Sequence, residues 1–119
     1  MVLQAITFPT TKSGWFETTI PINNKDITIG YEYDLMFKNY KFSIENNGVK
    51  LNDLYCKSAM PMNYSMKNVH DFLVFSYNIC KTNPMGYADE FERGINKLFI
   101  ADEEGYKYFL NNILNNEGN

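Results

Sequence analysis

The sequence holds few of the residues from which metal sites, catalytic centres and nucleic-acid interfaces are usually built. Its 119 residues include a single histidine, two cysteines and a single tryptophan. The His, Cys and carboxylate residues do not cluster at the spacing of metal ligands. The formal net charge of −3 offers no basic face for nucleic acid. We therefore expect neither a metal or other cofactor nor a nucleic-acid partner.

Long hydrophobic runs are also missing. No stretch is long enough to cross a bilayer, and residues 1–9 lack the basic start and apolar core of a secretory signal. These absences predict a cytoplasmic protein with no membrane partner. In that compartment Cys56 and Cys80 are expected to be reduced thiols, with a disulfide between them as the alternative.

Recognisable catalytic arrangements are lacking too. His70 and Asp71 are neighbours on an expected strand, so their side chains point to opposite faces and do not orient each other. The acidic residues within 89–92 and 102–104 lie beside turns, which favours solvated or helix-start positions over paired catalytic carboxylates. No glycines have the spacing of a phosphate-binding loop. We therefore expect that the protein is not an enzyme.

What the sequence does contain is a two-residue alternation of apolar and polar side chains. Within residues 26–33, apolar and aromatic residues occupy every second position, which is the period of a strand with one buried face. The alternation returns in residues 40–45. Asn46-Asn47-Gly48 then predicts a type I′ turn into residues 49–51. Residues 25–51 are thus expected to form an antiparallel meander.

Further strands are expected on both sides of this meander. Residues 16–22 predict a first full strand, with Pro21 placing it at a sheet edge and Asn23-Asn24 as a tight turn. Residues 52–68 show no clear period and are expected to be a long loop with one short extended piece around residues 54–56. Residues 69–80 are expected to form another strand, in which residues 72–75 are apolar on both faces and residues 76–79 alternate. This pattern predicts a central strand covered on both sides. Residues 95–100 predict the last strand.

The period changes to that of a helix near the carboxyl end. Asp102 is the expected N-cap, although Gly105 favours a later start at Tyr106. We expect the apolar stripe of this helix to pack on the chain's own sheet. The stripe consists of Tyr106, Phe109, Leu110, Ile113 and Leu114.

Together these elements predict a mainly β, single-domain fold. It is an antiparallel sandwich or partly open barrel of about six strands, with a C-terminal α-helix packed on it. Residues 1–15 are expected to form an N-terminal arm or edge strand. Residues 16–100 form the antiparallel β-domain, and residues 101–119 the C-terminal helix and tail.

Large aromatic and methionine side chains in or beside the expected loops are the remaining clue to function. Such residues are enriched in protein interfaces. Met60 and Met62 also suit the alternative of filling a gap in the core. The candidate interface residues are Trp15, Phe16, Tyr55, Met60, Met62, Tyr64, Met85 and Tyr87.

We therefore predict a small acidic protein-binding domain of the inhibitor or immunity type. It would occlude a surface of a protein partner whose identity the sequence does not give. The alternative is a structural component of a larger assembly, such as a phage tail, in which the chain binds copies of itself. Unpaired strand edges at residues 1–8 and 16–22 would then join neighbouring subunits.

Overall fold

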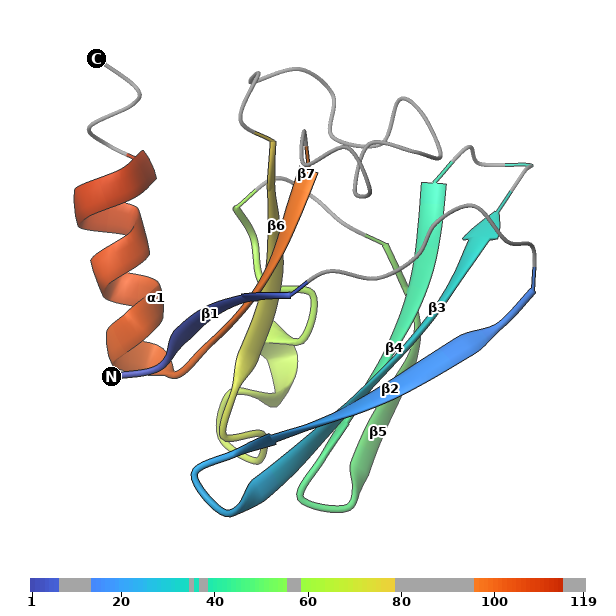
Figure 1. Cartoon of the computed structure of the whole chain (residues 1–119), viewed down its shortest axis with the longest axis horizontal. Helices are drawn as coiled ribbons and strands as arrows, with labels where there is room; N and C mark the ends of the chain where they lie inside the picture. Colours follow the sequence, from blue (N-terminus) through green and yellow to red (C-terminus); the bar gives the residue numbers. More distant parts are fainter. Residues whose placement is uncertain (7–13, 35, 37–38, 56–58, 79–95, 115–119) are drawn as a thin grey trace.

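The computed structural model describes residues 1–6, 14–34, 36, 39–55, 59–78 and 96–114. Within these residues, seven strands form two antiparallel sheets and a helix follows the last strand (Figure 1). The two sheets pack face to face, so the fold is a mainly β sandwich with a C-terminal helix, as the sequence predicts. No helix among the described residues is both long and apolar enough to span a bilayer.

The four-stranded sheet is the predicted meander, in the order β2-β3-β4-β5. Its strands are β2 (Phe16–Ile22), β3 (Lys25–Asp34), β4 (Asn39–Asn46) and β5 (Val49–Tyr55). Strand β5 continues through residues 52–53, where the sequence suggested loop, into residues 54–55, where the short extended piece was predicted. Its pairing with β4 shifts register between Phe42 and Ile44.

Two-residue turns close the first and last hairpins of this sheet. Asn23 and Asn24 have φ angles of 50° and 67°, and Asn47 and Gly48 have φ angles of 54° and 76°. Both central residues of a type I′ turn need positive φ, which asparagine and glycine tolerate better than other residues. The turn predictions are therefore confirmed.

The three-stranded sheet has the order β1-β7-β6, with β1 at Leu3–Ile6, β6 at Leu73–Asn78 and β7 at Asn96–Ala101. The expected N-terminal arm thus contains an edge strand paired with β7. Strand β7 lies in the middle of its sheet, although the sequence suggested that it closes the sheet as the last strand.

The structure corrects the prediction of a central strand at residues 69–80, which is β6 in the structure. It begins at Leu73 rather than near Val69, and it is an outer strand of its sheet. The prediction of burial on both faces is nevertheless confirmed. Val74 faces the core between the sheets, whereas Phe75 faces a second core beneath the helix. The outer edge of β6 is covered by the preceding segment, because the Ala59 amide donates to the Ser76 carbonyl (2.6 Å) and the Met62 amide to the Val74 carbonyl (2.8 Å).

Helix α1 (Glu103–Phe109), continued by a π-helical turn at Leu110–Leu114, packs on the three-stranded sheet on the side away from the other sheet (Figure 1). Asp102 is the N-cap, and its Oδ1 accepts a hydrogen bond from the Gly105 amide at 2.7 Å. The predicted N-cap is therefore confirmed, whereas the later start at Tyr106 is wrong, because the helix begins at Glu103. Gly105 is required there because a Cβ atom would overlap the carbonyl of Val2.

A group of polar residues, here named the polar clasp, ties the hairpin turns to the segment that precedes β6. The Asn46 Oδ1 accepts from the Asp71 amide (2.6 Å), and the Asn47 side chain donates to the Asp71 carboxylate (2.8 Å). Lys25 forms an ion pair with the same carboxylate at 2.7 Å. Hydrogen bonds from Lys25 and then Asn47 lower the pKa of Asp71. The clasp thus fixes the turn end of the four-stranded sheet.

Candidate protein-binding face

The outer surface of the four-stranded sheet points away from both cores. Alternating residues of β3 and β4, such as Ile29 and Ile44, are buried between the sheets, so their neighbours in sequence point outward. We name this outer surface the acidic face. Its charged side chains are Glu17, Asp26, Glu32, Asp34, Lys41, Glu45, Lys50 and Asp53.

Negative charge is concentrated on the acidic face. The described residues of this face include six carboxylates and two ammonium groups and carry a net charge of −4, compared with −3 for the whole chain. The remaining residues therefore carry a net charge of +1. The weak overall acidity of the sequence hides a strong asymmetry, because the acidic residues come from four separate strands.

The ion pairs on this face are long and exposed. Lys41 Nζ lies 3.9 Å from Glu32 and 4.0 Å from Asp53, and Lys50 Nζ lies 3.9 Å from Glu17. Exposed pairs of this kind contribute little to stability, about 1 kcal/mol at most. Asp26 and Glu45 form no ion pair with any described residue. These two carboxylates thus have no compensating cation among the residues that the structure describes.

Trp15 lies across the middle of the acidic face. Its six-membered ring sits against Gly30, where a Cβ atom would overlap the ring and approach the Ser43 hydroxyl. Gly30 and Ser43 are cross-strand partners, so two small residues create a depression for the indole. The indole Nε1 donates to Glu17 Oε1 at 3.2 Å, and the tryptophan remains 42% exposed. The ring is therefore held in place while part of it faces solvent.

Tyr55 adds a second aromatic side chain to the same face. It pairs with Lys41 across the β4–β5 ladder, and its hydroxyl donates to the Asp34 carboxylate at 3.0 Å. Partial burial, and then this hydrogen bond, raise the pKa of Tyr55. The phenol therefore stays protonated at neutral pH and acts as a hydrogen-bond donor.

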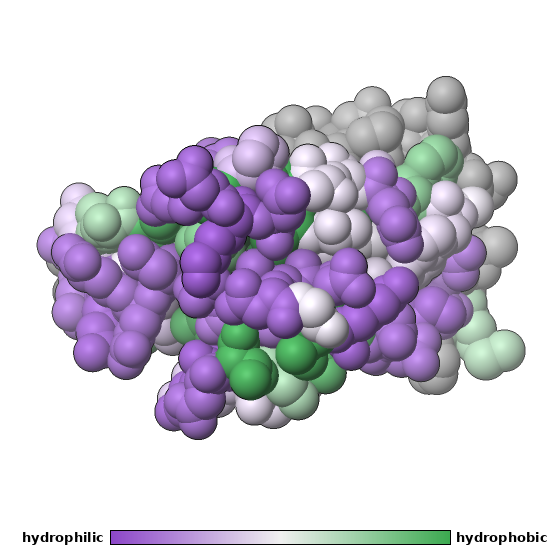
Figure 2. All heavy atoms as spheres, turned by 90° about the horizontal axis from the view of Figure 1, so that it is seen from below, coloured by the Kyte–Doolittle hydropathy of each residue, from purple (hydrophilic) through white to green (hydrophobic). Residues whose placement is uncertain are grey.

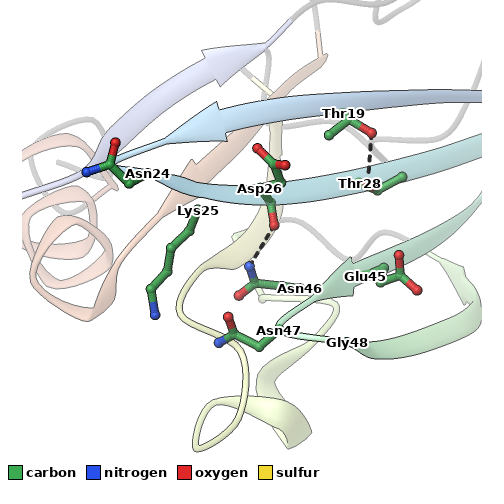
Figure 3. A pocket seen from close by; sticks show the side chains of 9 residues that line it. All are labelled: Thr19, Asn24, Lys25, Asp26, Thr28, Glu45, Asn46, Asn47 and Gly48. Carbon is green, nitrogen blue, oxygen red and sulfur yellow. Dashed lines mark hydrogen bonds between the residues drawn. The ribbon is translucent and has the colours of Figure 1, made fainter.

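At the turn end, the acidic face continues into a polar hollow of about 440 Å³ (Figure 3). The Thr19 and Thr28 hydroxyls lie 2.9 Å apart across β2 and β3, and the Asn46 amide donates to the Asp26 carbonyl at 3.0 Å. Figure 2 shows this end of the molecule, where most of the surface is hydrophilic and a small hydrophobic group lies at its margin. The hollow suits polar or cationic groups better than apolar ones.

The other predicted contact residues that the structure describes do not gather on this face. Phe16 points into the sandwich core, where its ring stacks on Tyr31 at 5.7 Å, and Met62 packs partly against the same core. Met60 is 56% exposed, so it fills no gap in the core. Met85 and Tyr87 lie outside the described residues, as do Cys56 and Cys80.

Tyr64 lies at a second site, a groove of about 560 Å³ between the segment before β6 and α1. Lys67 Nζ contacts Tyr64 twice, 3.2 Å from the hydroxyl and 4.6 Å from the ring centre. Across the groove, the Tyr106 hydroxyl donates to the Ala59 carbonyl at 2.8 Å. Acidic and basic side chains both line this groove, among them Glu103 and Lys107. The groove therefore has no charge preference that identifies an occupant.

The His70 ring is held in the interior by two hydrogen bonds. Its Nδ1 accepts from the Asn63 side-chain amide at 3.0 Å, which leaves the proton on Nε2 to donate to the Val49 carbonyl at 2.8 Å. The ring is buried, and both nitrogens are occupied by these contacts. The described residues also hold no group of three or more His, Cys, Asp or Glu placed to bind a metal.

Trp15 and Tyr55, predicted as contact residues from the sequence, both lie on the acidic face, but the sequence did not predict that face as a whole. The available signal was Gly30, because an isolated glycine inside an alternating strand often marks a close approach of another group. The acidic residues gave no local signal, since only strand register brings them together. No protein-family model matches the chain, and a search of curated proteins finds no match.

Proposed function

We propose that this protein is a non-enzymatic binding domain whose acidic face occludes a basic surface of a partner protein. The observation that carries the proposal is the net charge of −4 on one sheet face in a chain of net charge −3. Complementary charge steers association and selects against partners of the same sign. The half-exposed indole of Trp15 supplies the kind of aromatic anchor that interfaces favour.

The proposal is tested by neutralising two carboxylates that have no ion-pair partner among the described residues. In the Asp26→Asn/Glu45→Gln variant the net charge of the face falls from −4 to −2. We expect the affinity for the natural partner, isolated by co-purification and then measured in purified form, to fall about tenfold at low salt. The difference in affinity between this variant and the unchanged protein should become smaller as the salt concentration rises, because salt screens the charges.

The matched control is Glu103→Gln/Glu104→Gln, which makes the same change of charge on α1. This variant should bind the partner as the unchanged protein does. If both double variants lost the same affinity for the partner, the effect would come from the total charge of the protein, and the proposal would be overturned. A partner that binds the Asp26→Asn/Glu45→Gln variant with full affinity would overturn it as well.

A second candidate function is that of a structural subunit in a larger assembly. Strands β1 and β2 each form one edge of their sheets, and β6 and β5 form the opposite edges. On β2 the residues Glu17, Thr18 and Thr19 are all exposed. The edge of β6, in contrast, is hydrogen-bonded by its own chain. An open edge can accept a strand from a neighbouring subunit. Native mass spectrometry should then give one closed oligomer, and a monomer at all concentrations would contradict it.

A further inference from the structure

We infer that Trp15 and Glu17 form a subsite for one arginine side chain of the basic partner. This inference rests on the proposed function, because it specifies which cationic group the acidic face receives at its centre. The site combines an aromatic ring with a carboxylate at the edge of that ring, joined by the hydrogen bond from Nε1 to Glu17 Oε1 at 3.2 Å.

The position of the indole suits a stacked cation. Gly30 and Ser43 support the ring from the sheet side, and the exposed 42% of the residue lies toward solvent. A cation over an indole is attracted electrostatically by the negative face of the ring. Because Glu17 holds the indole nitrogen, the orientation of the ring is set before a partner arrives.

The carboxylate of Glu17 is available to an incoming cation. Among the described residues its cationic neighbour is Lys50, whose Nζ lies 3.9 Å from Oε1. The lysine side chain is 44% exposed and the glutamate side chain 48% exposed. A pair at this distance and exposure is weak. An arginine can therefore displace Lys50 and leave its ammonium in water at little cost.

Guanidinium fits this subsite better than ammonium. It is planar, so it can stack on the indole while its edge donates two parallel hydrogen bonds to one carboxylate. An ammonium group is a strongly hydrated point charge and gains less from the flat ring. The acidic residues around the subsite attract either cation, so selectivity for arginine must come from Trp15 and Glu17.

The experiment uses the whole protein and two peptides, deca-arginine and deca-lysine. Trp15 is the single tryptophan in the chain, so its fluorescence reports directly on the subsite. We expect deca-arginine to change the tryptophan emission and to bind about fivefold more tightly than deca-lysine by calorimetry. In Glu17→Gln the preference for arginine should disappear, whereas Lys50→Gln should strengthen arginine binding because the competing ammonium is gone.

Glu104→Gln on α1 is the control and should leave both affinities unchanged. Equal binding of the two peptides by the unchanged protein would overturn the arginine subsite while leaving a basic partner for the acidic face. Retention of the arginine preference in Glu17→Gln would also overturn it. Failure of both peptides to bind at low salt would count against the proposed function itself.

Discussion

Replacing Phe109 by alanine is expected to lower the free energy of unfolding by about 3–5 kcal/mol. The Phe109 ring is completely buried between α1 and the three-stranded sheet. Its centre lies 4.8 Å from Phe75, 5.3 Å from Tyr77 and 5.6 Å from Phe99. The substitution opens a cavity and removes the main attachment of a helix too short to be stable alone. Urea unfolding followed by circular dichroism measures the change.

Tyr108→Ala is the matched control, because Tyr108 is the preceding residue of α1 and is 45% exposed. It should change the free energy of unfolding by about 0.5 kcal/mol or less. A loss below about 1 kcal/mol in Phe109→Ala would mean that the helix contributes little to the fold. The proposed role of Phe109 in attaching the helix would then be wrong.

The parts of the fold that the sequence predicted depend on local chemistry. The turns at 23–24 and 47–48 need only positive φ, which Asn and Gly supply within the turn itself. The alternation of residues 26–33 likewise identifies a buried face without any knowledge of the partner strand. These turns and this strand are therefore expected in any tertiary arrangement that buries the same face.

The errors concern features decided by other parts of the chain. Strand β6 is apolar on both faces because one face packs on the opposite sheet and the other packs on α1. A central strand has apolar residues on both faces too, so this pattern does not distinguish the two positions. As an outer strand β6 has one edge that no strand of its sheet pairs with, and residues 59–62 form hydrogen bonds along that edge. The start of α1 depends on the close approach of Val2 to Gly105, and the residues involved are more than 100 positions apart in sequence.

In the candidate site, too, the residues with a local sequence signal were predicted and those brought together by strand pairing were not. Trp15 and Tyr55 were predicted as contact residues from their type and their position near expected loops. The concentration of carboxylates was not predicted, because Glu17, Asp26 and Glu45 stand far apart in sequence. Register places Glu17 beside Gly30 and Glu45 beside Thr28, and thus builds the acidic face. A site made by strand pairing therefore needs the pairing to be known.

Replacing Asn63 by alanine is expected to destabilise the fold by about 3 kcal/mol or more. The Asn63 side chain is fully buried. Its Nδ2 donates to the Phe72 carbonyl (2.8 Å) and to His70 Nδ1 (3.0 Å), and its Oδ1 accepts from the Val74 amide (2.9 Å). Alanine leaves all three groups buried without this partner, at about 1–3 kcal/mol each. The loss is measured by urea unfolding at neutral pH.

Asn47→Gly distinguishes burial from the mere number of hydrogen bonds. The Asn47 side chain makes two hydrogen bonds, to the Val69 carbonyl (2.9 Å) and to Asp71 (2.8 Å), compared with three for Asn63. They lie at an exposed position where water can replace the side chain. Glycine keeps the positive φ of 54°, so only the side-chain bonds are lost, and about 1 kcal/mol or less is expected. If both substitutions cost the same, water must enter the site of Asn63. The segment that covers the edge of β6 would then be held by its backbone bonds alone.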